Sequence, residues 1–137
     1  MRGMWNPTGP RVVVADDDPD IRDLVSHVLR DVGYNVQKAM DVPTAMHCLH
    51  FPGVAAAILD MLFVNSGGRS GLDLLRYMRG TPRLEKVPVI VITGFFLNRS
   101  VVADIEALHA EVWHKPVYPL DLVQRLNHLL YHRAPGR

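Results

Sequence analysis

The sequence has one cysteine among its 137 residues, Cys48, and little excess charge, with a formal net charge of +1 at pH 7. A single cysteine excludes an internal disulfide and any metal site built from several cysteines, and it fits a reducing compartment such as the cytoplasm. A net charge so close to zero gives no electrostatic reason to expect binding to nucleic acid or to an anionic membrane.

Long hydrophobic runs are also missing. The longest uncharged apolar run covers residues 87–97, well short of the roughly 20 residues that a membrane-spanning helix needs. Residues 1–10 hold no apolar segment long enough for a secretory signal. Because they contain glycine and two prolines, we expect a flexible leader there.

What the sequence does contain is a regular alternation of short apolar runs and amphipathic stretches. The apolar runs predict strands at residues 12–15, 34–38, 54–59, 87–92 and 111–114. The amphipathic stretches predict helices from residue 19 to just before Gly33, and at residues 44–50, 72–79, about 99–108 and 119–132. This order predicts a doubly wound α/β domain, in which a five-stranded parallel sheet lies between two layers of helices.

Polar residues follow four of the five predicted strands. Asp16 and Asp17 follow the first, Asp60 the third, Thr93 the fourth and Lys115 the fifth. In open sheets of this type the ligand site lies outside the carboxyl ends of the strands, so these side chains are expected to meet there.

The chemistry of this set points to phosphoryl transfer. Three carboxylates at one edge repel each other unless a cation neutralises them, and Mg²⁺ prefers oxygen ligands. A lysine adds a further positive charge and a threonine adds a hydroxyl, which together suit the stabilisation of a phosphoryl group in transit. A carboxylate can itself accept that group.

Each residue also has an ordinary structural explanation. Residues 16–18 could form a solvated turn in which Asp18 caps the next helix, Thr93 could simply end a strand, and Lys115 could be a surface charge. Cys48 is expected in the core, and Trp113 is expected to pack under the last helix. The histidines at positions 47 and 50 are expected at the surface.

The segments VVVADDDPD, ILDM, VIVITG and HKP, in this order and at these spacings, resemble the signature of receiver domains of bacterial two-component response regulators. The resemblance covers residues 11 to about 131, and we expect a receiver domain at residues 11–132 followed by a short tail at 133–137. It implies a flavodoxin-like fold with five helices and the strand order 2-1-3-4-5.

The resemblance also implies roles for single residues. Asp60 would be the phosphoacceptor, Asp17 a direct Mg²⁺ ligand and Asp16 a ligand through water. The backbone carbonyl of Leu62 would complete the metal site. The residues implied around the phosphoryl group are Thr93 as hydrogen-bond donor, Lys115 as counter-charge, Gly94 as a small neighbour, and Pro116 after a cis peptide bond.

The function implied is that of a phosphorylatable switch rather than an enzyme. A sensor histidine kinase or a histidine phosphotransfer protein would phosphorylate Asp60 with Mg²⁺, and phosphorylation would change binding to a downstream protein target that the sequence does not name. The expected location is the cytoplasm, without direct binding to nucleic acid or membrane. Both a stand-alone receiver and a piece of a longer regulator remain open.

Several positions depart from the family pattern. The loop after Asp60 is about three residues longer than usual, and Val64 stands where proline is common. Leu62 and Phe95 are bulky and apolar beside the expected phosphate, where they would shield it from water. Val112 replaces an aromatic residue that often takes part in switching.

These departures keep two alternatives open. One is a degenerate receiver that binds a partner without being phosphorylated. The other is an aspartate-nucleophile phosphatase of the haloacid dehalogenase type, which usually needs a second aspartate where Leu62 stands.

Overall fold

The computed structural model describes residues 7–64, 66–94 and 96–131. The expected leader and tail lie largely outside this part, so those two assignments remain predictions. The elements in chain order are β1 (Arg11–Ala15), α1 (Pro19–Asp31), β2 (Asn35–Ala39), α2 (Val42–His50), β3 (Val54–Asp60), α3 (Gly71–Arg79), β4 (Val89–Thr93), α4 (Arg99–Ala107), β5 (Glu111–His114) and α5 (Pro119–Tyr131).

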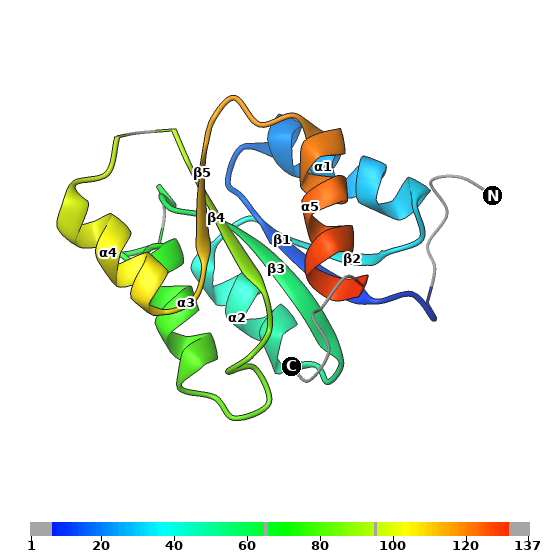
Figure 1. Cartoon of the computed structure of the whole chain (residues 1–137), viewed down its shortest axis with the longest axis horizontal. Coiled ribbons are helices and arrows are strands. Elements are labelled where there is room, and N and C mark those ends of the chain that lie inside the picture. The colour runs from blue at the N-terminus through cyan, green and yellow to red at the C-terminus, as the bar shows by residue number, and fades with distance from the viewer. Residues whose placement is uncertain (1–6, 65, 95, 132–137) are drawn as a thin grey trace.

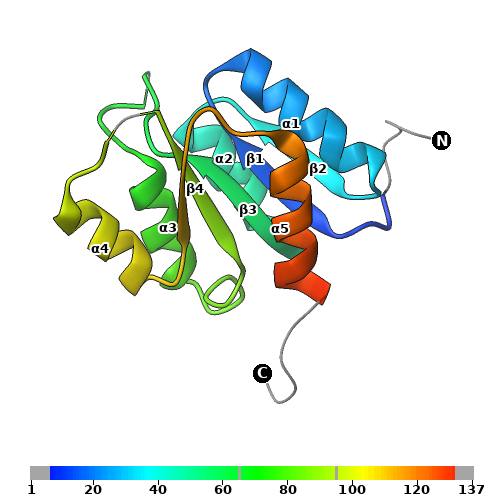
Figure 2. The same ribbon diagram turned by 45° about the horizontal axis from the view of Figure 1, so that its top comes forward.

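The five strands form one parallel sheet in the order β2-β1-β3-β4-β5. Helices α1 and α5 cover one face, and α2, α3 and α4 cover the other (Figures 1 and 2). Both the predicted three-layer fold and the predicted strand order are confirmed. The sheet is covered on both sides, which explains why its central strands are apolar at every position except one terminal residue each.

Alternate residues of each strand belong to two separate cores. Val13 and Leu59 pack in the core with α2, α3 and α4, whereas Val12 and Ile58 pack in the core with α1 and α5. The edge strand β5 follows the same rule, since Val112 packs against the first core and Trp113 against the second. The expected position of Trp113 near α5 is confirmed.

Turn chemistry sets the ends of the first helix. The Asp18 carboxylate accepts the N–H groups of Asp20 and Ile21, as predicted for an N-cap. At the other end Gly33 has a φ of 102°, and the N–H of Tyr34 donates to the Leu29 carbonyl at 3.1 Å. Tyr34 therefore belongs to the helix end, and β2 begins one residue later than predicted.

The other elements begin and end within one residue of their predicted bounds, except for the starts of α2 and β4. Helix α2 begins at Val42, two residues early, because its N-cap Asp41 accepts the N–H of Thr44. Strand β4 begins at Val89 because the N–H of Val87 closes a turn onto Leu84. Cys48 is buried in the core as predicted. Within the described ranges, no helix has the length and hydropathy of a membrane span.

Candidate functional site

The polar residues that follow the strands meet at one edge of the sheet. Asp60 at the end of β3 is paired with Ile92 of β4, and Thr93 at the end of β4 is paired with His114 of β5. The N–H of Lys115 donates to the Thr93 carbonyl at 2.8 Å, which holds the chain after β5 against the end of β4. Parallel pairing therefore brings four distant segments together, as the sequence predicts.

Three carboxylates form the centre of this edge. Asp16, Asp17 and Asp60 each place an oxygen so that these oxygens lie within 4.8 Å of one another. Asp16 is only 3% exposed and Asp60 only 5%. Buried carboxylates are costly without a cation or hydrogen bonds to offset their charge. The donors are all hard oxygen atoms, so the cluster fits Mg²⁺.

Lys115 supplies the positive charge that the protein itself brings to the cluster. Its Nζ lies 3.4 Å from Oδ2 of Asp16 and 3.5 Å from Oδ2 of Asp60. A Cβ placed on Gly94 would lie 3.7 Å from Cδ of Lys115, so Gly94 borders the stem of the lysine. The bond from Lys115 to Pro116 is cis, as predicted.

The electrostatics of Asp60 follow from this geometry. Burial, and then the charge and hydrogen bond of Asp16, raise the pKa of Asp60 to about 7. Lys115 and the N–H of Leu62 act in the opposite direction, because both favour the ionised carboxylate. A cation bound at the cluster would oppose this rise in the pKa of Asp60 and keep the carboxylate ionised near neutral pH.

Asp17 is tied to the long loop between β3 and α3. Its Oδ2 accepts the N–H of Val64 at 3.1 Å. The loop is held in turn by Ser66, which is 4% exposed and whose Oγ accepts the N–H of Val42, the first residue of α2, at 3.1 Å. Sequence reasoning missed Ser66, because a serine in a glycine-rich loop gives no sign of burial.

Arg22 of α1 is a second neighbour that the sequence did not reveal. Its Nη1 donates to the Asp16 carbonyl at 3.0 Å, and Oδ1 of Asp16 accepts the N–H of Asp18 at 2.9 Å. These contacts fix the main chain between β1 and α1. A hollow of about 290 Å³ beside them is lined by Asp17, Pro19, Arg22, Met40 and Asp41.

Gly71, the first residue of α3, is the third residue that was missed. A Cβ at this position would lie 2.3 Å from the carbonyl oxygen of Asp60. The sequence places Gly71 at the end of a glycine-containing loop, and no local pattern indicates contact with main-chain atoms eleven positions earlier.

Thr93 and Leu62 follow or end strands at the same edge as the aspartates, and their roles toward a phosphoryl group remain predictions. Thr93 is fully buried at the end of β4. Leu62 directs its N–H to Asp60, while its side chain is 48% exposed, and the ligand role of its carbonyl stays a prediction. Phe95 lies outside the described residues. Its neighbour Phe96 is 98% exposed.

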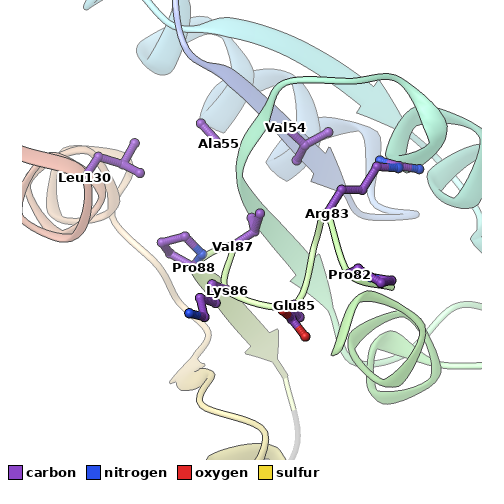
Figure 3. Close-up of a pocket in the computed structure, with 9 residues that line it drawn as sticks. All are labelled: Val54, Ala55, Pro82, Arg83, Glu85, Lys86, Val87, Pro88 and Leu130. Atoms are coloured by element: carbon purple, nitrogen blue, oxygen red, sulfur yellow. The ribbon is translucent and has the colours of Figure 1, made fainter. Parts of the chain in front are cut away.

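A larger cavity, of about 390 Å³, lies at the opposite end of the strands from the acidic cluster, where β3 and β4 begin (Figure 3). It is bordered by the start of β3, the connection from α3 to β4, and Leu130 near the end of α5. None of the three clustered aspartates lines it. The cavity is therefore separate from the acidic cluster.

Comparison with protein families and curated relatives gives a consistent result. Residues 12–127 match the family model described as response regulator receiver domain. The chemotaxis protein CheY of Pseudomonas aeruginosa is 33% identical, with 71% of this chain and 77% of that protein covered. The transcriptional regulatory protein AruR of the same species is 33% identical, but the match covers 88% of this chain and 49% of AruR. The chain thus spans about half the length of the transcriptional regulators that it matches.

Solved structures show the same fold. Chemotaxis protein CheY4 of Vibrio cholerae superposes with a TM-score of 0.77 at 26% identity, over 90% of this chain and all of that one. A receiver domain protein of Methanospirillum hungatei gives a TM-score of 0.80 at 22% identity, over 91% of this chain and 96% of that one.

Proposed function

The chain belongs to the response regulator receiver domain family, and on this premise we propose that it accepts a phosphoryl group on Asp60 from a sensor histidine kinase or a histidine phosphotransfer protein. The observation that carries the proposal is the burial of Asp60 beside two further carboxylates, with Lys115 at 3.5 Å. A solvated capping turn would not need a lysine held between two buried aspartates.

The proposed transfer is a single displacement at phosphorus. A carboxylate oxygen of Asp60 attacks the phosphorus of the donor phosphohistidine, the phosphorus–nitrogen bond breaks, and its electron pair returns to the imidazole nitrogen. Lys115 would stand close to the charge that the phosphoryl oxygens bring, and the Thr93 hydroxyl would donate a hydrogen bond to one of them.

The same proposal includes Mg²⁺. Asp17, Asp60 and the Leu62 carbonyl would hold the ion directly, and Asp16 would bind it through water. Bound Mg²⁺ would supply positive charge that offsets the charge of the phosphoryl oxygens. The carboxylate positions support this part of the proposal, because all three offer oxygen atoms at one edge.

The role proposed for the phosphorylated chain is to change its affinity for a downstream protein, not to turn over a substrate. A switch of this kind requires a partner that binds the two states with different affinity. Our proposal includes a cytoplasmic location, where a histidine kinase would be reached and where Cys48 would remain reduced.

The two alternatives receive less support from the site. A phosphatase would need an acid–base group at position 62, and the side chain of Leu62 has none. A degenerate receiver would be expected to lack part of the polar set, whereas Asp16, Asp17, Asp60 and Lys115 lie together here.

The test is intact-mass measurement after incubation with acetyl phosphate, with and without Mg²⁺. The expected result is one added phosphoryl group on the wild-type chain, only with Mg²⁺, and none on Asp60→Asn. Asp121→Asn, which changes an exposed aspartate of α5, should behave as wild type. Equal phosphorylation of Asp60→Asn would refute the proposal.

A further inference from the structure

The start of α3 lies directly on the main chain of the proposed phosphoacceptor. A Cβ on Gly71 would lie 2.3 Å from the carbonyl oxygen of Asp60, 3.1 Å from its carbonyl carbon and 3.2 Å from Cα of Met61. All three neighbours are backbone atoms, so no side-chain rotation could relieve these contacts. Any side chain at position 71 would have to move the backbone itself.

Position 71 requires glycine because a side chain would have no room there, not because of its backbone conformation. The glycines with positive φ among the described residues are Gly33, Gly53, Gly67 and Gly68, and Gly71 is not one of them. Alanine could therefore adopt its backbone conformation, and alanine favours a helix over glycine by about 0.5–1 kcal/mol. Helix propensity alone would make Gly71→Ala neutral or stabilising.

Further contacts fix the same piece of main chain. The N–H of Gly71 donates to the Met61 carbonyl at 3.0 Å, and the N–H of Met61 donates to the Ile92 carbonyl of β4 at 2.7 Å. Leu62 and Ser70 form an antiparallel β-bridge. The chain after Asp60 is thus held between β4 and the first turn of α3.

We propose that Gly71 is a positioning residue for the acidic site: its missing side chain sets the place of the main chain from Asp60 to Leu62. That main chain carries the Asp60 carboxylate and directs the Leu62 N–H toward it. This inference rests on the proposed function for its meaning, but it makes a prediction about cation binding that is independent of phosphorylation.

The experiment compares Gly71→Ala with Gly80→Ala at the other end of the same helix. Gly80 has a φ of −88°, and a Cβ there would lie 3.4 Å from the Arg76 carbonyl, an ordinary contact. Mg²⁺ affinity is measured by calorimetry, amide chemical shifts report the main chain at Met61 and Leu62, and phosphorylation by acetyl phosphate is expressed per folded molecule.

We expect Gly71→Ala to bind Mg²⁺ about tenfold or more weakly and to be phosphorylated at least as much more slowly, because small misplacements at a reacting centre have effects of this size. Its amide shifts should change at Met61 and Leu62. Gly80→Ala should stay within about twofold of wild type in both measurements, as an ordinary surface substitution does.

Wild-type Mg²⁺ affinity in folded Gly71→Ala, or equal losses in both variants, would overturn the inference. If Gly71→Ala is partly unfolded, the assays are repeated in trimethylamine N-oxide, which favours the folded state. A chain that stays unfolded there would also contradict the inference, because the contact would then serve the whole fold. If wild type binds Mg²⁺ but is never phosphorylated, the proposed function fails while the Mg²⁺ comparison still tests Gly71.

Discussion

At the scale of single residues, the ionisable carboxyl group of Asp60 is deeply buried. Its pKa is raised from 3.8 to about 7, first by burial and then by Asp16. Between about pH 4 and pH 7, the Asp60 carboxyl group therefore holds its proton in the folded chain but has lost it in the unfolded chain. The free energy of unfolding consequently falls as the pH rises from about 4 to about 7.

This gives a prediction for Asp60→Asn in the absence of Mg²⁺. The variant should melt several degrees above wild type at about pH 8, where it removes a buried charge, and the difference should shrink toward zero near pH 4. Thermal unfolding followed by circular dichroism at both pH values measures this. An equal difference at the two pH values would show that charge is not the cause.

Replacing Lys115 by methionine should have opposite effects on two quantities, the affinity for Mg²⁺ and the rate of phosphorylation. Lys115→Met keeps the apolar stem beside Gly94 but removes the charge at 3.4–3.5 Å from two carboxylates. Without a competing positive charge, Mg²⁺ should bind several-fold more tightly. Phosphorylation should nevertheless slow by about 100-fold, the size of effect seen when one group that stabilises developing charge is lost.

Calorimetry measures Mg²⁺ binding, and intact-mass time courses measure phosphorylation. The control is Lys86→Met, which changes a lysine at the opposite end of the strands from the acidic cluster. Weaker Mg²⁺ binding by Lys115→Met would contradict the assignment of Lys115 as a competing charge.

The sequence reveals some of these residues and hides others for a physical reason. The aspartates, Thr93 and Lys115 could be predicted because a residue that ends a strand of a parallel sheet must lie at its carboxyl edge. Ser66 and Gly71 could not, because their partners are backbone atoms of distant residues, and backbone contacts leave no pattern in the amino-acid sequence.

At the scale of elements, the loop between β3 and α3 connects the acidic site to α2. Ser66→Ala removes the acceptor of the buried Val42 N–H, which should cost about 1–3 kcal/mol of stability. Because the same loop brings the Val64 N–H to Asp17, Mg²⁺ affinity should also fall a few-fold.

Thermal unfolding and Mg²⁺ titration of Ser66→Ala measure these losses. Ser100→Ala is the control, because Ser100 is exposed and its hydroxyl donates to the neighbouring, exposed Asn98. If Ser66→Ala is destabilised but binds Mg²⁺ as wild type does, the position of the loop does not affect the metal site and this prediction is wrong.

The segment at residues 93–98 is the element that we expect to transmit phosphorylation. Val112 and Trp113 face opposite sides of the sheet, so the indole cannot substitute for an aromatic ring at position 112. The ring of Phe96 lies 5.9 Å from the ring of His114 and links this segment to the end of β5. Thr93 begins the segment, and α4 follows it.

Adding beryllofluoride, a phosphoryl mimic, should therefore shift the amide signals of residues 93–98 and of the first turn of α4. Comparison of amide spectra with and without the mimic measures this. Shifts confined to the acidic cluster, or centred on Val112 while the segment stays unchanged, would contradict the proposed route.

At the scale of the whole molecule, the alternation of strands and helices predicts a doubly wound sheet from periodicity alone. The strand order did not follow from periodicity: it was expected only from the resemblance to receiver domains, and the sheet confirms it. Boundaries such as the start of β2 depend on turn hydrogen bonds that close around Gly33, which hydrophobic spacing does not reveal.

The central claim is that Asp60 itself carries the phosphoryl group, and peptide mapping after borohydride reduction tests it most directly. Borohydride reduces an aspartyl phosphate to homoserine and leaves free aspartate unchanged, so the product marks the acceptor. After treatment with acetyl phosphate and Mg²⁺, homoserine should be found at position 60 alone, and it should be absent when Mg²⁺ is omitted. Homoserine at position 16 or 17, or unmodified aspartate at position 60 in a chain that has gained a phosphoryl group, would contradict the account.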